Sequence, residues 1–361
     1  MKTLTVKPLL FVLGIAISVA IQADEFSDEY QSYQSASEAG DYASAVSHGL
    51  KAYELAATKY GKEDLQYAAV GLNLAAAMGQ DQSQGFRGRW DEAYGIAENS
   101  LAIFEKHYGD KAVELIDALS ITAEVSKDNK QARDLYRRAL SIAQKAKDPQ
   151  LFALTQMTAY ERLSNTEFNN SQVQSYIHRA QKYFSTNLQE NSVIRVKANF
   201  LLAKAEFGNG QYRKAEPLFL DVIKQYDTLN FSHPYALAAR TGLIAIYERE
   251  GEEDKATEQC QAIGKMRPWN DNQQQVPLFR VEPKYPMSAA QARKEGWVKL
   301  AFTIDEKGMV VDPKILDSEG GLGFEKATED ALKKWRYAPK FVDGKPVAAE
   351  STVRLDFELA K

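Results

Sequence analysis

The residues of this 361-residue sequence that could carry chemistry are few and far apart. None of the four histidines has a second histidine or cysteine at the helical spacing that a metal site would use. The lone cysteine, Cys260, has no sequence neighbour that would make it a nucleophile, and it cannot form a disulfide within the chain. The Gly-rich stretch 320–323 does not follow a strand with a phosphate-binding signature. We therefore expect no enzyme activity, no metal and no cofactor. The histidines are His48, His107, His178 and His233.

The clearest positional pattern lies near the C-terminus, where apolar residues alternate with other residues. Every second residue from Val298 to Ile304 is apolar and large, which predicts a strand with one buried face. The turn residues at 305–308 predict a hairpin, so the next apolar run should return antiparallel to the first. Pro313 cannot donate a hydrogen bond within that returning strand. The strand should therefore lie at an edge of the sheet or carry a bulge.

A helix and a third strand complete this pattern. Apolar residues recur at helical spacing from Phe324 to Trp335, a stripe that can cover one face of a small sheet. Alternation returns at 352–359, where the odd-numbered residues are apolar, and it predicts the last strand. The order strand, strand, helix, strand predicts a small α+β domain with an antiparallel sheet. The apolar side chains of the last strand should face the helix, and Trp335 should be buried against the sheet.

Specific residues of this region resemble the TonB C-terminal domain. The matching positions are Pro283-x-Tyr285-Pro286, Glu295-Gly296-x-Val298, Asp305-x-x-Gly308, Ser318, Phe324 with Ala331, Trp335-Arg336-Tyr337-x-Pro339 and Gly344-x-Pro346-Val347. In that family the domain takes up the extended N-terminal motif of an outer-membrane transporter as an added strand, with backbone hydrogen bonds giving affinity. The resemblance therefore implies a partner-binding strand edge. Its residues are Thr352, Val353, Arg354, Leu355, Asp356, Phe357 and Glu358.

The middle of the chain repeats itself about every forty residues, which is the sequence signature of stacked supersecondary units. In each clear copy a Gly precedes, by two positions, a residue that is usually aromatic, and an Ala follows three positions later. The Gly allows the turn between two helices because it tolerates positive φ. The clear copies begin at Gly40, Gly88, Gly210 and Gly251, and weaker copies are predicted at Ala132-x-x-x-Tyr136-x-x-Ala139 and Val173-x-x-x-Ile177-x-x-Ala180.

These copies resemble the tetratricopeptide repeat (TPR) in the longer form of kinesin light chains. Residues 80–88 are interpreted as a loop inserted in the second repeat. A HEAT-like helical pair of similar length is the alternative. Stacked repeats form a superhelix whose concave face binds other proteins, so the resemblance implies an unknown protein partner. Corners between repeats are expected at Tyr60-Gly61, Tyr108-Gly109 and Ser232-His233-Pro234.

The first residues have the features of a secretory signal peptide. Lysines accompany a short apolar stretch from Pro8 to Ala20, and Ala23 is a small residue at the predicted cleavage point. This pattern predicts export to the periplasm. The alternative is an uncleaved membrane anchor, although the stretch is shorter than the roughly twenty residues that a span requires. The net charge of −4 comes without a basic stripe that could follow phosphates, which argues against nucleic acid as a partner.

The sequence thus predicts a multidomain chain with a signal peptide at 1–23, an α-helical TPR-like solenoid at 27–268, a polar linker at 269–279 and a small α+β TonB C-terminal domain at 280–361. Two functions fit this order. The first is a periplasmic scaffold protein that engages an outer-membrane TonB-dependent transporter or another envelope protein. The second is an energy transducer for transport, in which the repeats replace a Pro-rich spacer and residues 1–23 stay attached as an anchor.

Overall fold

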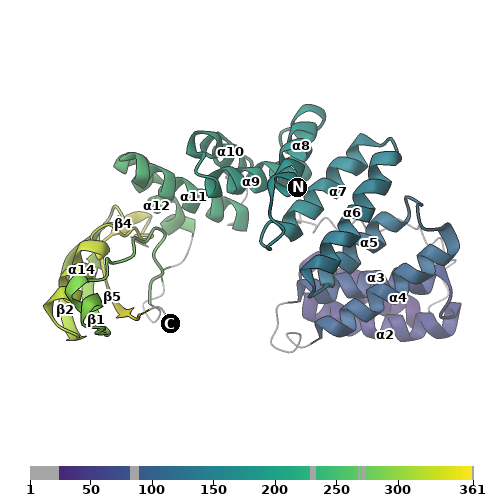
Figure 1. Ribbon diagram of the computed structural model, residues 1–361, viewed down its shortest axis with the longest axis horizontal. Helices are drawn as coiled ribbons and strands as arrows, with labels where there is room; N and C mark the ends of the chain where they lie inside the picture. The colour runs from purple at the N-terminus through teal and green to yellow at the C-terminus, as the bar shows by residue number, and fades with distance from the viewer. Residues whose placement is uncertain (1–23, 82–88, 228–232, 267–268, 270–273, 360–361) are drawn as a thin grey trace. The chain divides into compact units, whose positions relative to one another are not determined.

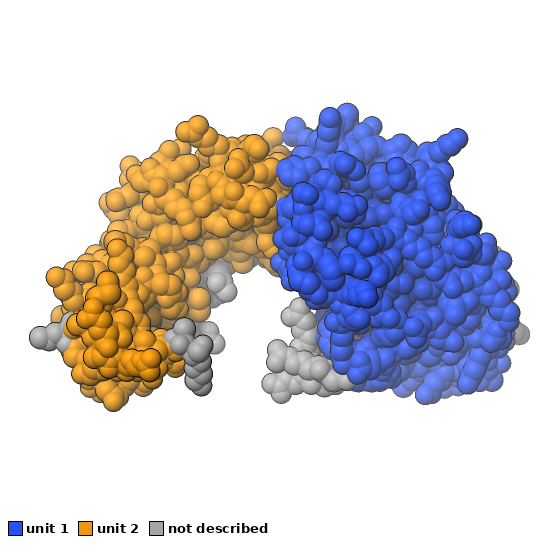
Figure 2. All heavy atoms as spheres, in the orientation of Figure 1, with its two compact units in different colours: residues 1–201 blue, residues 202–361 orange. Residues whose placement is uncertain are grey.

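The computed structural model describes residues 24–81, 89–227, 233–266, 269 and 274–359. The chain forms two compact units that divide after Leu201 (Figure 2), inside helix α9 (Val193–Gly208). Unit 1 is helical throughout its described part, and unit 2 contains further helices followed by the described strands (Figure 1). The predicted signal peptide, the turn glycine Gly88 and most of the predicted inserted loop lie outside the described residues.

Unit 1 is a row of antiparallel helix pairs. Each helix contacts the next from α1 through α8, and the first helices of successive pairs also touch, α3 with α5 and α5 with α7. This is the stacking that a helical-repeat solenoid requires, and it confirms the predicted architecture. The helices are α1 (Glu25–Ala39), α2 (Tyr42–Tyr60), α3 (Leu65–Gln80), α4 (Trp90–Tyr108), α5 (Leu115–Val125), α6 (Asn129–Lys145), α7 (Pro149–Leu163) and α8 (Ser171–Asn187).

Short polar side chains and glycines set the ends of these helices. The carboxylates of Asp24 and Asp64 accept the backbone N–H of the residue two positions ahead, at 3.1 and 2.7 Å, and so satisfy donors that have no partner within the helix. Gly40 follows α1 with a φ of 76°, and Gly61 follows α2 with a φ of 91°. Residues with a Cβ rarely adopt such positive φ angles. Glycine therefore occurs both at the turn within a helix pair and at the corner between two pairs.

The two weaker repeats are also helix pairs. Tyr136 lies in α6 and Ile177 in α8, each the second helix of its pair, and both side chains are fully buried. No glycine stands at either inner turn. Instead Asp128 and Asn170 cap the second helices through hydrogen bonds from the backbone N–H groups of the first turn. An N-cap residue therefore takes the place of the glycine, which is why the repeat signature weakens in the sequence here.

The helices of unit 2 continue the pairing after α9. Gly251, with a φ of 75°, forms the turn between α11 and α12. Arg240 of α11 is buried and donates two hydrogen bonds to the carboxylate of Asp227, at 2.6 and 2.8 Å, and one to Gln259 of α12 at 2.7 Å. We call α11 and α12 the terminal helix pair. The helices are α10 (Tyr212–Tyr226), α11 (Pro234–Glu250) and α12 (Glu253–Met266).

The C-terminal part of unit 2, residues 280–359, is called the module below and is built on an antiparallel sheet in the order β2-β1-β5. Strands β1 (Gly296–Ile304) and β2 (Val310–Glu319) form the predicted hairpin, in which Asp305 accepts the backbone N–H of Met309 at 2.8 Å. Strand β5 (Ala349–Phe357) pairs with the other side of β1. Strand β2 is an outer strand with two register shifts, one of them at Pro313, which confirms the prediction of a bulged edge.

Helix α14 (Leu322–Leu332) contacts β1 and β2, so the predicted order is confirmed. The structure adds a second hairpin between α14 and β5, made of β3 (Lys340–Val342) and β4 (Lys345–Val347), and a short helix α13 (Met287–Gln291) before β1. It also corrects the end of the helix. Trp335 lies three residues beyond Leu332, in the turn that follows α14, and not inside the helix.

Trp335 is nevertheless buried in the core of the module, as predicted. Its exposed fraction is 1%, and it belongs to the same apolar cluster as Val298, Leu300 and Phe302 of β1. The indole N–H donates to the backbone carbonyl of Val281 at 2.8 Å, so its polar atom is also satisfied. The ring therefore joins the segment before β1 to the sheet.

Candidate functional site

Strand β5 leaves one of its edges without a strand neighbour in the described part of the chain. Its other edge pairs with β1 over 9 residues without a register shift, from Gly296 opposite Phe357 to Ile304 opposite Ala349. The outer strand β2 is different, because its two register shifts and Pro313 interrupt the regular row of donors and acceptors. Of the two outer strands, β5 is therefore the one with a regular edge.

The side chains of β5 divide between two faces in the predicted alternation. Leu355 and Phe357 are buried and Val353 is half-buried, and the ring of Phe357 packs 4.5 Å from that of Phe324 in α14. The side chains of the opposite face are exposed. They are Thr352, Arg354 and Asp356, and Glu358, which directly follows the strand, is exposed too.

One contact fixes which backbone groups of β5 point away from β1. The side-chain amide of Gln274, in the segment before the module, donates to the backbone carbonyl of Thr352 at 3.0 Å. This carbonyl therefore points to the free edge. Because the N–H and C=O of one residue in an antiparallel strand point to the same side and alternate along the chain, Arg354 and Asp356 also present theirs to the free edge. Leu355 instead faces β1.

The exposed face beside this edge is polar, and several of its side chains contact one another. The guanidinium of Arg354 lies 4.3 Å from the centroid of the Trp297 ring and 2.9 Å from the carboxylate of Asp356. The indole N–H of Trp297 donates to Glu319 of β2 at 2.9 Å. Lys299 stands directly opposite Arg354, a like-charged pair that the carboxylate of Asp356 offsets. Charges in this position discourage the edge from pairing with a second copy of itself.

A second feature of the module is its contact with the terminal helix pair. Arg336, only 1% exposed, lies between α14 and β3, and its Nε is 2.5 Å from a carboxylate oxygen of Glu248 in α11. Both backbone groups of Arg336 are also hydrogen-bonded. Its carbonyl accepts the N–H of Leu278 at 2.7 Å, and its own N–H donates to the carbonyl of Phe279 at 3.0 Å. A buried arginine therefore ties together the helix pair, the linker and the module.

Two glycines allow the module and α12 to approach closely. A Cβ added to Gly264 of α12 would lie 2.6 Å from the backbone carbonyl oxygen of Pro339 and 2.9 Å from the Phe341 ring. A Cβ added to Gly308 would lie 2.2 Å from the carbonyl oxygen of Tyr337 and 3.2 Å from Cβ of Cys260. No larger side chain fits at either position without a shift of backbone, so this junction is closely packed.

Cys260 and two of the histidines have partners or surroundings that the structure defines. Burial raises the pKa of Cys260 to about 12, so its thiol stays protonated and is a poor nucleophile. His233 accepts the backbone N–H of Tyr235 at 3.1 Å as the cap of α11, and burial lowers its pKa. Nδ1 of His48 lies 2.6 Å from the carboxylate of Glu29. Over the described ranges, no three His, Cys, Asp or Glu side chains are placed to hold a metal ion.

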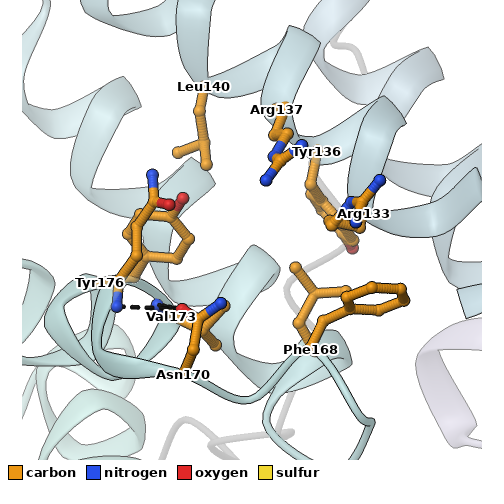
Figure 3. A pocket seen from close by; sticks show the side chains of 10 residues that line it. Arg133, Tyr136, Arg137, Leu140, Phe168, Asn170, Val173 and Tyr176 are labelled. Atoms are coloured by element: carbon orange, nitrogen blue, oxygen red, sulfur yellow. Dashed lines mark hydrogen bonds between the residues drawn. The ribbon is translucent and has the colours of Figure 1, made fainter. Parts of the chain in front are cut away.

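A pocket in unit 1 between α6 and α8 is too small for a ligand. Figure 3 shows Arg133 over the ring of Phe168, at 4.5 Å from its centroid, with Tyr136 and Tyr176 among the other lining residues. The cavity volume is about 10 Å³, close to the space that one water molecule requires. Small-molecule sites usually enclose roughly 300–1,000 Å³. The pocket is therefore a packing feature of the repeats.

The sequence predicted some residues of this site and missed others. Six of the seven predicted residues, 352–357, lie in β5, and Glu358 directly follows it. Of these six, Thr352, Arg354 and Asp356 present their backbone groups to the free edge, and the role of all seven in binding remains a prediction. Sequence reasoning missed Gln274 at that edge and the pair of Glu248 with Arg336. Arg336 was singled out only as part of a motif, and nothing in the sequence around Glu248 marks it as its partner.

Residues 281–359 match the family model described as the C-terminal domain of the Gram-negative bacterial TonB protein. The matched range contains the sheet, helix α14 and the free edge of β5. The module is therefore a TonB C-terminal domain, which confirms the resemblance found in the sequence. Within the part of the chain that the structure describes, no helix is long and apolar enough to cross a membrane.

Individual relatives match the same part of the chain. The TonB protein of Pseudomonas aeruginosa is 35% identical over 85 residues, which are 24% of this chain and 25% of the relative. The TonB protein of Escherichia coli is 38% identical over 69 residues, 19% of this chain and 27% of the relative. The matched part thus spans only about a quarter of the length of these two curated relatives.

Solved structures are similar to both parts of the chain. The solution structure of the Pseudomonas aeruginosa TonB C-terminal domain is 36% identical and covers 25% of this chain and 92% of that chain, with a TM-score of 0.22. A crystal structure of kinesin-light-chain-like, nearly identical TPR-like repeats from Podosopora anserina is 16% identical. It covers 58% of this chain and 100% of that chain, with a TM-score of 0.44.

Proposed function

We propose that this chain is a non-catalytic interaction protein of the periplasm, whose module binds an outer-membrane TonB-dependent transporter or another envelope protein. The partner contributes an extended segment that adds to the sheet as a strand along β5. The observation that carries the proposal is the regular, unpaired edge of β5 in a domain of the TonB C-terminal kind. Backbone hydrogen bonds along such an edge supply affinity, and alternating side chains supply register.

The repeats supply a second interaction surface for a protein that the sequence and structure do not name. The first helices of successive pairs touch one another in unit 1, as α3, α5 and α7 do. In solenoids of this kind the continuous face formed by such helices is the usual protein-binding surface. The chain would then act as a scaffold that connects a partner of the repeats to a partner of the module.

Energy transduction is the second candidate function, and the close packing of the module against the terminal helix pair favours it. The buried pair of Arg336 with Glu248 and the close approach at Gly264 would hold the module firmly on the terminal helix pair, as a helical arm in place of a flexible spacer requires. This function also needs residues 1–23 to remain attached as an anchor. Sequencing the N-terminus of the protein purified from cells separates the two candidates, because a mature protein that starts at Asp24 has no anchor.

Proline scanning of β5 tests the strand-addition step. Arg354→Pro removes an N–H that points to the free edge, so it should leave the pairing with β1 intact and weaken binding of an added strand by about tenfold. Arg354→Ala is the matched control, because it removes the side chain and its contact with Trp297 but keeps the N–H. Leu355→Pro removes an N–H that faces β1 and should disturb the fold, which circular dichroism would detect.

The binding measurement uses isothermal titration of the full chain with synthetic peptides that copy the N-terminal segments of outer-membrane transporters from the same organism. We expect the wild type and Arg354→Ala to bind within a few-fold of each other and Arg354→Pro to bind much more weakly. A folded Arg354→Pro variant that binds like the wild type would show that the partner does not add to this edge. Absence of binding by the wild type would refute the transporter as the partner.

A further inference from the structure

Gln274, in the segment before the module, contacts the free edge of β5 at one point. It donates a side-chain N–H to the carbonyl of Thr352 at 3.0 Å. In an added strand a backbone N–H would donate to this same carbonyl. The primary amide of Gln274 therefore stands in for the amide of a bound peptide, and the edge already holds one hydrogen bond of the kind that strand addition would supply.

Described residues on both sides of Gln274 contact the module. On one side Trp269 packs against the core of the module. On the other side Leu278 and Phe279 are hydrogen-bonded to the backbone of Arg336, at 2.7 Å to its carbonyl and 3.0 Å from its N–H. Arg336 is itself buried and paired with Glu248.

The position of Thr352 on the strand determines what this contact does. The outward backbone groups of β5 belong to Glu350, Thr352, Arg354 and Asp356, and Gln274 reaches the second of them. In a peptide that pairs along the whole edge, a backbone N–H donates to the carbonyl of Thr352 in place of the side-chain amide of Gln274. The amide of Gln274 then loses its partner, or turns to solvent, before the full ladder of hydrogen bonds can form.

We propose that Gln274 is an intramolecular competitor for the partner-binding edge, and that binding of an extended peptide displaces it from Thr352. This inference rests on the function proposed above and adds a residue that sets the affinity of the same site. The linker is then more than a spacer between the repeats and the module. It keeps the edge partly occupied until a peptide with enough backbone hydrogen bonds replaces it.

The variant Gln274→Ala in the full chain tests this proposal. It removes the competing donor, so the same synthetic transporter peptides should bind about two- to tenfold more tightly than they bind the wild type, the range that one intramolecular hydrogen bond represents. Gln261→Ala is a closely matched control. Gln261 also donates from an exposed side-chain amide to a backbone carbonyl of the module, that of Glu306 at 3.0 Å, but it lies away from β5. This control should leave peptide affinity unchanged.

Each outcome bears on one proposal or the other. Tighter binding by Gln274→Ala than by the wild type, with no such gain for Gln261→Ala, supports the competitor. Equal affinities of wild type and Gln274→Ala, or an equal gain with Gln261→Ala, overturn the competitor and leave strand addition standing. If no peptide binds wild type or variants, strand addition by transporters is wrong and the competitor with it. Thermal unfolding midpoints of both variants verify that the module stays folded.

Discussion

Removal of the carboxylate of Glu248 should separate the module from the terminal helix pair. Glu248→Ala leaves the guanidinium of Arg336, which is 1% exposed, without its charged partner at 2.5 Å. Loss of one member of a buried ion pair destabilises proteins by about 3–5 kcal/mol, because the remaining charge stays desolvated. Among the described residues, the other hydrogen-bond contact of the guanidinium is Thr257 at 3.5 Å, which is too long to replace the carboxylate. We therefore expect the full penalty.

Urea unfolding of the full chain, followed by tryptophan fluorescence, measures this effect. Trp297 and Trp335 lie in the module, and Trp269 packs against it, so the signal reports mainly on this part of unit 2. With a slope of about 1–3 kcal/mol per molar urea, a loss of this size lowers the midpoint by roughly 1–5 M. Two variants of the same helix serve as controls.

Glu248→Gln keeps a hydrogen-bond acceptor for Arg336 and should lose less stability than Glu248→Ala. Glu250→Ala removes an exposed carboxylate from the same helix and should change the midpoint little. If Glu248→Ala shifts the midpoint no further than Glu250→Ala does, the ion pair does not hold the junction, and the module must be regarded as independent of the helix pair.

Two further predictions concern single side chains. Trp335→Ala should lower the free energy of unfolding of the module by about 3–5 kcal/mol, the usual range for a large aromatic ring removed from a core, and a urea midpoint that hardly moves would contradict its burial. Burial raises the pKa of Asp117 in unit 1 to about 6, so the folded state binds its proton more tightly than the unfolded state does. Unit 1 should therefore lose stability as the pH rises from about 4 to 6. Asp117→Asn should remove this dependence and stabilise the unit at pH 7 by about 1–2 kcal/mol; equal unfolding curves of wild type and variant at pH 7 would argue against it.

The regular elements were predictable because each has a local signature. The alternation from Val298 to Ile304 predicts β1, and the repeated glycines predict the turns of the solenoid. The hairpin of β3 and β4 was missed because strands of 3 residues are too short to show alternation. A signal was nevertheless present in Asp343-Gly344, a dipeptide typical of a tight hairpin turn, whose φ angles of 50° and 76° are both positive.

The contacts that define the site could not be predicted, because they join residues far apart in the sequence. Glu248 looks like an ordinary charged residue in the last turn of a helix, and only the packed junction shows that it faces Arg336. The polar composition around Gln274 indicates a linker, but composition does not show that the linker passes the edge of β5. The helical stripe was extended to Trp335 because the turn after α14 continues to cover the sheet at nearly the same spacing.

The buried thiol at the junction gives the chain its own chemical probe. Cys260 is the only cysteine of the sequence and is fully buried in α12, beside Gly308 of the module. The thiol also packs against α11 and the linker. A thiol reagent can reach it only while this junction of helix pair, linker and module is open, so the labelling rate relative to a free thiol gives the fraction of time for which the junction is open. No second cysteine contributes a background signal. The labelling rate of the natural cysteine can therefore show, without any introduced residue, whether binding at β5 loosens or tightens the contact between the module and the terminal helix pair.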